Sequence, residues 1–224
     1  MVNIIVLAFV YLVGISLLLI FNELNYRRLK IKGEFTRKFA HFTATLAVVP
    51  FPYIFTSHWY VLVLASLFCA VLFITHQIKQ LKSIHDIERK SIGSYLLPLS
   101  IYVTFLISDL SDDKFIFMLP MLILAISDPM AAILGINIVN YNGKIKIFGR
   151  KLSKTYLGSG AFFVSSFIIS LIAFYFHFKV FDLKTFWLAL IIAVTGTLAE
   201  LISWRGSDNL TIPLSIVLVL VLFL

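Results

Sequence analysis

Residues 115–134 read FIFMLPMLILAISDPMAAIL, and Asp128 is the only charged side chain in this run. A helix of this length crosses the roughly 30 Å hydrocarbon core of a bilayer. Lipid offers no hydrogen bonds to backbone polar groups, so a segment this apolar must form a helix rather than a loop. The stretch therefore predicts a membrane-spanning helix that carries one acid.

Apolar runs of similar length recur on both sides of this helix. Of the 224 residues, 60% are hydrophobic and 13% are charged, whereas a soluble domain has roughly 25% charged residues. An ordinary soluble fold is therefore excluded, and we expect one all-α domain over residues 1–224, a polytopic membrane helix bundle of about eight transmembrane helices. The expected spans lie near residues 2–21, 39–56, 59–75, 92–108, 115–134, 157–176, 185–203 and 210–224.

Some of these spans have individual features. Residues 2–21 have no cation before them, so we expect a retained first helix rather than a signal peptide. Pro50 and Pro52 should bend or break the second helix, because proline removes a backbone donor and clashes with the preceding turn. The last apolar segment, residues 212–224, gives only about 20 Å of helix, so it either starts earlier or does not fully span. The single cysteine, Cys69, is expected to be a packed thiol.

The distribution of Lys and Arg predicts the orientation of the bundle. Sixteen of the 19 Lys and Arg residues lie in the loops after the first, third, fifth and seventh expected helices. Cytoplasmic loops carry an excess of these cations, so the odd-numbered loops should be cytoplasmic and both termini should lie outside. Contact with anionic lipid headgroups is the plain alternative role for these side chains.

Two acids, Asp128 and Glu200, lie late in expected helices that run toward the cytoplasm, and each is the only charged residue of its apolar run. An ionisable group within a span is costly and is a functional-site hypothesis by default. The alternative is a carboxylate that is paired with a nearby cation for structural reasons. Pro129 follows Asp128 and interrupts helical hydrogen bonding, which can open the carboxylate to a polar cavity.

The stretch between residues 143 and 159 combines five cations with glycines and hydroxyl residues and contains no acid. Glycines let backbone N–H groups converge on phosphate oxygens, and a helix N-terminus expected near residue 157 adds partial positive charge. The pattern favours a polyphosphate site, with generic anionic-lipid contact as the alternative, and it lacks the P-loop signature. The anion-binding candidates are Lys144, Gly149, Arg150, Lys151, Lys154, Thr155, Gly158 and Ser159.

Asp208 and Asn209 stand just before the last expected helix. They can cap that helix. Placed on the same face as Asp128 and Glu200, they can instead hold Mg²⁺, which takes one or two carboxylates together with phosphate oxygens and water.

A third polar group precedes the second expected helix. If this segment is helical, Arg37 and His41 are four residues apart on one face, with Lys38 beside them. A lone histidine at a membrane boundary is usually only hydrogen-bonded, so His41 is the less favoured candidate for direct chemistry.

Together these stretches resemble the CTP-dependent polyprenol kinase family, which includes dolichol kinases, phytol kinases and CTP-dependent diacylglycerol kinases. The resemblance runs from about Glu34 to Pro213. Two positions depart from it: Ser127 stands where the family usually has Gly, and Ser207 stands where it often has Asp. Five motifs occur in order: Arg37-Lys38-x-x-His41; Arg89-Lys90-Ser91-Ile92-Gly93 followed by Pro98; Asp128-x-x-Ala131-x-x-x-Gly135; Lys154-Thr155-x-x-Gly158-Ser159; and Glu200 with Asp208-Asn209-x-x-x-Pro213.

The resemblance implies transfer of the γ-phosphoryl group of CTP to the hydroxyl of a membrane lipid alcohol, either a polyprenol or dolichol, a phytol-like isoprenoid or diacylglycerol. We expect Mg²⁺ as cofactor, no nucleic-acid partner and an active site that faces the cytoplasm. The hypothesised catalytic residues are Asp128, Lys154, Glu200 and His41, and the hypothesised metal ligands are Asp128, Glu200 and Asp208. The hypothesised nucleotide-binding residues are Arg37, Lys38, Arg89, Lys144, Gly149, Arg150, Lys151, Lys154, Thr155, Gly158, Ser159 and Asn209.

Two other function classes stay open. A CTP-dependent lipid-phosphate cytidylyltransferase has a related arrangement of aspartate and lysine residues, but it would act on a lipid phosphate and release pyrophosphate. A membrane transporter would usually show an inverted repeat and polar groups at mid-bilayer. In this sequence the polar groups gather toward one face, and no clear repeat is visible.

Overall fold

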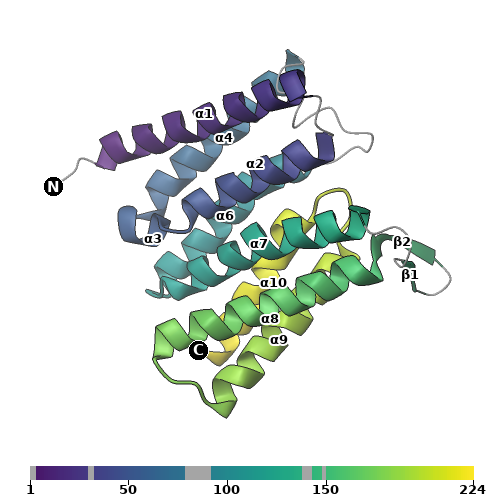
Figure 1. Cartoon of the computed structure of the whole chain (residues 1–224). Coiled ribbons are helices and arrows are strands. Elements are labelled where there is room, and N and C mark those ends of the chain that lie inside the picture. Colours follow the sequence, from purple (N-terminus) through teal and green to yellow (C-terminus); the bar gives the residue numbers. More distant parts are fainter. Residues whose placement is uncertain (1–3, 30–32, 79–91, 138–142, 148–149) are drawn as a thin grey trace.

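The computed structural model describes residues 4–29, 33–78, 92–137, 143–147 and 150–224. These residues form a series of helices and one short hairpin (Figure 1). In chain order the elements are α1 (Ile4–Leu29), α2 (Gly33–Val48), α3 (Phe51–Ile54), α4 (His58–Gln77), α6 (Gly93–Leu110), α7 (Phe115–Asn137), β1 (Lys144–Ile147), β2 (Arg150–Thr155), α8 (Tyr156–Phe178), α9 (Leu183–Ile202) and α10 (Asp208–Phe223).

Six of the described helices, α1, α4, α6, α7, α8 and α9, are long and apolar enough to cross a membrane. Helices α2 and α10 are shorter, with 16 residues each. The protein is therefore an all-α polytopic membrane helix bundle. Each of the predicted spans overlaps a described helix, and the short last segment does start earlier than residue 212, at Asp208.

Helix α2 differs from the span that the sequence predicted over residues 39–56. It starts at Gly33 and ends at Val48, and the short α3 follows it. Pro50 occupies the N-cap of α3 and Pro52 its first turn, so the prediction that these prolines break the helix is confirmed. Because α2 starts early, Lys38 lies inside a helix and not in the loop to which the sequence assigned it.

An antiparallel hairpin occupies part of the region in which only a loop was predicted. Strand β1 pairs with β2, and Lys144 lies opposite Thr155. Strand β2 ends at Thr155 and α8 begins at Tyr156, so no linker separates the hairpin from the helix. The hairpin is thereby fixed in direction relative to the bundle.

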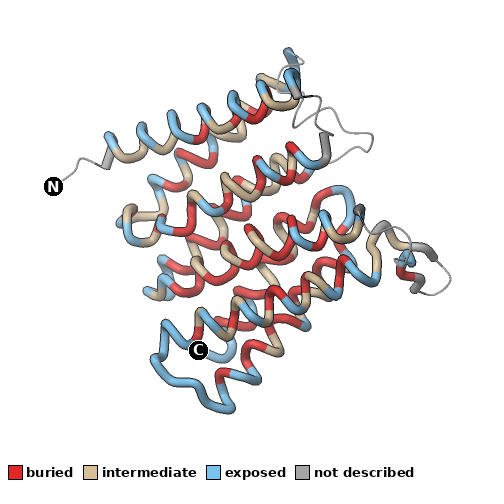
Figure 2. The backbone as a smooth tube through the Cα atoms, viewed as in Figure 1, coloured by how far each residue is buried: buried red, intermediate tan, exposed pale blue. Residues whose placement is uncertain are grey.

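Helix α7 is the central element of the bundle. About two thirds of its spanning segment, 67%, is buried inside the protein, compared with 22% for α1 and for α4, and Figure 2 shows the difference in colour. One apolar core packs α7 against α8, α9 and α10, with Phe162 and Ile216 fully buried. A second core, around Phe51 and Phe117, joins α7 to α3, α4 and α6. A polar group on α7 is therefore held between two layers of helices.

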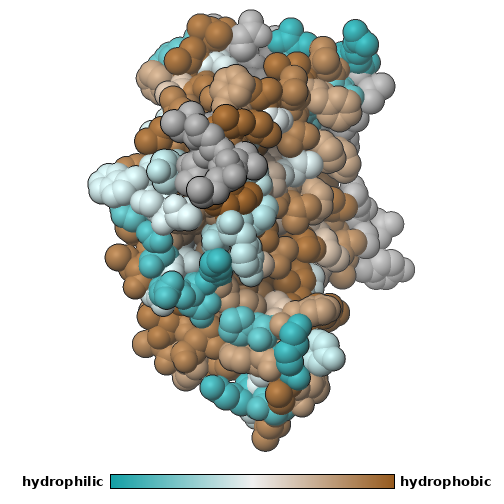
Figure 3. Space-filling model, turned by 90° about the vertical axis from the view of Figure 1, so that its left-hand side faces the viewer, coloured by the Kyte–Doolittle hydropathy of each residue, from teal (hydrophilic) through white to brown (hydrophobic). Residues whose placement is uncertain are grey.

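Successive helices run in alternating directions, so both termini lie at one end of the bundle and the hairpin lies at the other (Figure 1). Figure 3 looks onto the end that carries the termini, where hydrophilic residues gather between surrounding hydrophobic side chains. The turns at this end include the exposed residues Asp112, Lys114, Lys179 and Asp182.

This arrangement sharpens the topology prediction. We expect cysteines introduced at Ser111 and Phe181 to react with a membrane-impermeant maleimide from outside the cell, and a cysteine at Lys151 to react only from the cytoplasmic side. The background is Cys69→Ala, because Cys69 is the single native thiol and is only partly buried. Reaction of all three positions from the same side would contradict the alternating bundle.

Candidate functional site

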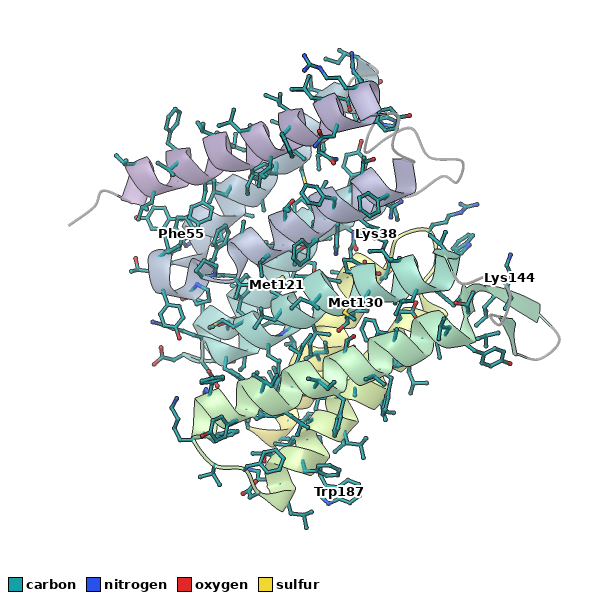
Figure 4. All side chains as sticks on the ribbon, viewed as in Figure 1. Lys38, Phe55, Met121, Met130, Lys144 and Trp187 are labelled. Carbon is teal, nitrogen blue, oxygen red and sulfur yellow. The ribbon has the colours of Figure 1, made fainter. Side chains whose placement is uncertain are left out.

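An ion pair joins helices α2 and α7 inside the bundle. Lys38 Nζ donates to Asp128 Oδ2 at 2.6 Å, and the two side chains are only 8% and 3% exposed. Figure 4 shows Lys38 toward the end of the bundle that carries Lys144 of the hairpin. His41 lies one turn further along α2, with Nε2 at 3.6 Å from the same Asp128 oxygen. Removing one partner of a buried ion pair destabilises a folded protein by about 3–5 kcal/mol. Separation of α2 from α7 is therefore unfavourable, and the pair holds the two helices together.

A second ion pair lies at the start of α8. Lys154, the penultimate residue of β2, places Nζ at 2.7 Å from Glu200 Oε1 on α9 and at 3.5 Å from Asp208 Oδ2 on α10. The other carboxylate oxygen of Glu200 accepts a hydrogen bond of 3.0 Å from Ser159 Oγ. The hairpin strand, α8, α9 and α10 therefore meet at one ammonium group and two acids.

Electrostatics links the two ion pairs into one site, which we call the charged cluster and define as Lys38, Asp128, Lys154, Glu200 and Asp208. Burial by itself lowers the pKa of Lys154, but the carboxylates of Asp208, Glu200 and Asp128 together raise it above its ordinary value. Lys154 is therefore protonated at neutral pH. Three carboxylates share two lysines in this cluster, which leaves it able to accept further positive charge.

The first turn of α10 is tied to the first turn of α6. Asn209 Nδ2 donates to the backbone oxygen of Gly93 at 2.7 Å. A Cβ atom at Gly93 would lie 3.1 Å from both Asn209 Nδ2 and the Gly206 backbone oxygen, so only glycine fits without a shift. Asn209, which the sequence assigned to nucleotide binding, thus has a structural contact of its own. The cap position of α10 belongs to Ser207, and Asp208 stands in the first helical turn.

The start of α8 is capped by the protein itself. Thr155 is the N-cap residue, and its Oγ1 accepts a hydrogen bond from the Gly158 backbone N–H at 3.2 Å. Gly158 also lies against Ala131 and Gly135 of α7. Small residues at such positions let two membrane helices approach closely. The prediction of a helix N-terminus near residue 157 is confirmed, and Gly158 has a packing reason of its own.

This packing gives a prediction with a matched control. A Cβ atom at Gly158 would lie 2.9 Å from the Ala131 backbone oxygen, whereas one at Gly160 would meet nothing within 4 Å. We expect Gly158→Ala to destabilise the protein by about 1–3 kcal/mol, because it forces α7 and α8 apart. Gly160→Ala should stay within about 1 kcal/mol of the parent protein. Thermal unfolding of both variants in the same detergent decides it, and equal melting temperatures would show that the close approach is unimportant.

The remaining predicted residues lie in different surroundings. Arg37 is partly buried, and its Nη1 atom has no hydrogen-bond partner among the described residues; the same holds for His41 Nε2. Lys144 is exposed on the hairpin. Arg89 and Gly149 lie outside the described residues, as do the side chains of Arg150 and Lys151.

No family model, curated protein or solved structure matches this chain. Its function is therefore inferred from the chemistry of the charged cluster and its surroundings.

A metal ion fits this cluster only where ligands from outside the protein complete its coordination. Within the described residues, no three His, Cys, Asp or Glu side chains form a group that could hold a metal by themselves. The acids are paired with lysines instead. However, Mg²⁺ needs only one or two protein carboxylates when phosphate oxygens supply the other ligands. The donor chemistry of Asp128 and Asp208 therefore fits a magnesium ion whose remaining ligands are phosphate oxygens and water.

Sequence reasoning missed part of the polar surface of α2. Thr45 is fully buried, and its Oγ1 has no hydrogen-bond partner among the described residues. Lys38, His41 and Thr45 follow a spacing of three and four residues, which places them on one helix face. The helical spacing of these three polar residues was the available signal. It would have indicated an inward-facing polar side of α2.

Proposed function

We propose that this protein is a lipid-alcohol kinase, which transfers the γ-phosphoryl group of a nucleoside triphosphate to the hydroxyl of a membrane lipid alcohol. The observation that carries the proposal is the charged cluster, in which Lys38, Asp128, Lys154, Glu200 and Asp208 come together from α2, α7, β2, α9 and α10. Ionisable groups within a membrane bundle are costly, and a purely structural role would be served more cheaply by apolar packing.

The proposed reaction needs positioning and charge neutralisation more than covalent chemistry from the protein. The lipid hydroxyl oxygen forms a bond to the γ-phosphorus while the bond between this phosphorus and the β–γ bridging oxygen breaks. The products are a lipid monophosphate and a nucleoside diphosphate. The hydroxyl proton passes to Glu200, or to His41 as the second choice. Holding both reactants in line at one site supplies much of the rate enhancement.

The lysines have the clearest roles in this scheme. Lys154 stands at the junction of the hairpin and α8 and carries a full positive charge, so it is placed to bind the phosphates as they gain charge in the transition state. Arg37 has a donor, Nη1, that no described residue accepts from. Lys144 stands opposite Thr155 on the exposed hairpin and would contact the triphosphate from its outer side.

Magnesium would be held by Asp128 and Asp208, and Glu200 would either complete the metal site or accept the hydroxyl proton. Bound Mg²⁺ neutralises phosphate charge and polarises the transferring group. The carboxylates would then exchange a lysine partner for the metal, and the freed ammonium groups of Lys38 and Lys154 would turn to the phosphate oxygens. CTP as the donor, and the cytoplasm as the side on which it binds, belong to the same proposal and follow from the family resemblance and the positive-inside rule.

The experiment that tests the proposal follows two labels in the same nucleotide. Purified protein is incubated with Mg²⁺ and CTP that carries a radioactive phosphorus at the γ or at the α position, together with lipid alcohols or phosphatidate in separate mixtures. Transfer of the γ-label to a lipid alcohol is the expected result. Transfer of the α-label to phosphatidate with release of pyrophosphate would establish the cytidylyltransferase instead. If no mixture yields a labelled lipid, both enzymatic functions are overturned and the transporter is favoured.

A further inference from the structure

A cavity of about 110 Å³ lies between α1, α2, α4 and α6, next to the charged cluster. Its walls are almost wholly apolar, and they include Ile15 and Leu19 of α1, Ala44 of α2, and Leu64 and Ala65 of α4. An apolar cavity offers water too few hydrogen-bond partners to hold it. The walls therefore match a hydrocarbon chain rather than a nucleotide or an ion.

One end of this cavity is polar. Lys38, His41 and Asn209 line it, together with Arg37. Two polar atoms at this end, Arg37 Nη1 and His41 Nε2, are buried and have no hydrogen-bond partner among the described residues. The His41 residue as a whole is only 8% exposed. Unpaired buried polar atoms are unfavourable. A ligand hydroxyl at this end would offer these atoms a hydrogen-bond partner.

The dimensions of the cavity select the kind of ligand. Its lining residues on α2 run from Arg37 to Val48 along one face, a length of about 16 Å at the helical rise. This is roughly half of the 30 Å hydrocarbon core. A volume of about 110 Å³ leaves no room for two aliphatic chains side by side and favours a single chain.

We propose that this cavity binds the tail of a single-chain lipid alcohol, an isoprenoid or fatty alcohol, with its hydroxyl at the Arg37 and His41 end. The hydroxyl then lies beside Asp128, because His41 Nε2 is 3.6 Å from Asp128 Oδ2, and in this position His41 rather than Glu200 takes its proton. Tail binding stands on the cavity alone, and only the phosphorylation of the hydroxyl rests on the proposed kinase function. Diacylglycerol, with two chains, would have to leave one of them outside the cavity.

The test is a cross-linking experiment without nucleotide. Purified protein in detergent is irradiated with a hexadecanol that carries a diazirine in mid-chain, and the labelled peptides are identified by mass spectrometry. Ala65→Phe fills the cavity from α4, whereas Ala70→Phe makes the same change at an exposed position of the same helix. We expect Ala65→Phe to lower the labelling by about tenfold, because added volume in a filled site excludes the chain. Ala70→Phe should leave the labelling within about twofold of the parent protein, since it adds volume outside the packed interior.

Two further measurements keep the result independent of folding defects. Ala44→Phe closes the same cavity from α2, and labelling of the parent protein should fall on Phe68 or Leu72 in the wall and not on the exposed neighbour Phe73. Unlabelled hexadecanol should compete with the probe, and dioleoylglycerol should compete poorly. Equal labelling of Ala65→Phe and Ala70→Phe, or cross-links on Phe73, would overturn the site. A negative kinase assay with the expected cross-links would overturn only the proposed function.

Discussion

Asp128→Asn is expected to abolish transfer of the γ-label to lipid. The substitution keeps the volume of the side chain and removes the charge that would hold Mg²⁺, and metal-mediated charge stabilisation is worth several kcal/mol of barrier. The measurement is the initial rate per folded protein at saturating CTP and lipid alcohol, with the folded fraction determined by size-exclusion chromatography. Activity above a few per cent of the parent would show that Asp128 is not a metal ligand.

The structure adds a control for this variant. Asp128 is the hydrogen-bonded partner of buried Lys38, so Asp128→Asn leaves an ammonium group unpaired and should destabilise the protein by about 3–5 kcal/mol. The double variant Asp128→Asn with Lys38→Met removes both charges and should recover much of the melting temperature. If Asp128 acts in the reaction, the double variant stays inactive. Recovery of turnover together with stability would show that the pair is only structural.

Lys154→Ala should lower turnover at saturating nucleotide by roughly 10²-fold or more, the scale of a charge contact of about 3 kcal/mol that is made in the transition state. Lys146→Ala removes a cation from the same hairpin and serves as the matched control, because it lies outside the motif pattern. If these cations served only to set topology, either variant would be mild, since fifteen other cations remain on that side. Equal, small effects of the two variants would therefore show that Lys154 serves only to set the membrane orientation.

A second comparison separates chemistry from stability at Lys154. Its ammonium group pairs with Glu200 and Asp208, so its loss removes their shared cation and should lower the yield of folded protein. Lys154→Arg retains the positive charge and should restore stability. We expect it to restore only part of the turnover, because the planar guanidinium presents its donors differently from an ammonium group. A Lys154→Arg variant with full activity would show that charge alone is required.

The sequence predicted the helices well because apolar length is a local property. Runs of about 20 apolar residues have no alternative to helix in lipid, and the described helices lie where these runs do. Glu200 and Asp128 were found because each is a lone acid in such a run. Their partners were not predicted, since Lys38 and Asp128 are 90 positions apart and their pairing depends on how α2 packs against α7.

Other features could not be predicted because they arise from packing between elements. Lys38 was assigned to a loop, since its charge stands at the boundary of an apolar run, and only the contact with α7 explains its burial. The hairpin was missed because only β1 alternates cations with apolar residues, over four positions, whereas β2 opens on two adjacent cations and shows no alternation. The cavity between α1, α2, α4 and α6 has no sequence signal at all, because its walls are brought together from different helices.

The order of the ion-pair partners along the chain has a consequence for membrane insertion. An aspartate at the centre of an inserting helix carries a cost of about 2.5–3.5 kcal/mol on translocon-based scales. Asp128 enters the bilayer after Lys38 has already been synthesised, so its partner is present when α7 inserts. Lys154 is made before both of its acids, on α9 and α10. The N-terminal half of the bundle can therefore close during synthesis, whereas the site around Lys154 is completed only when the last two helices arrive.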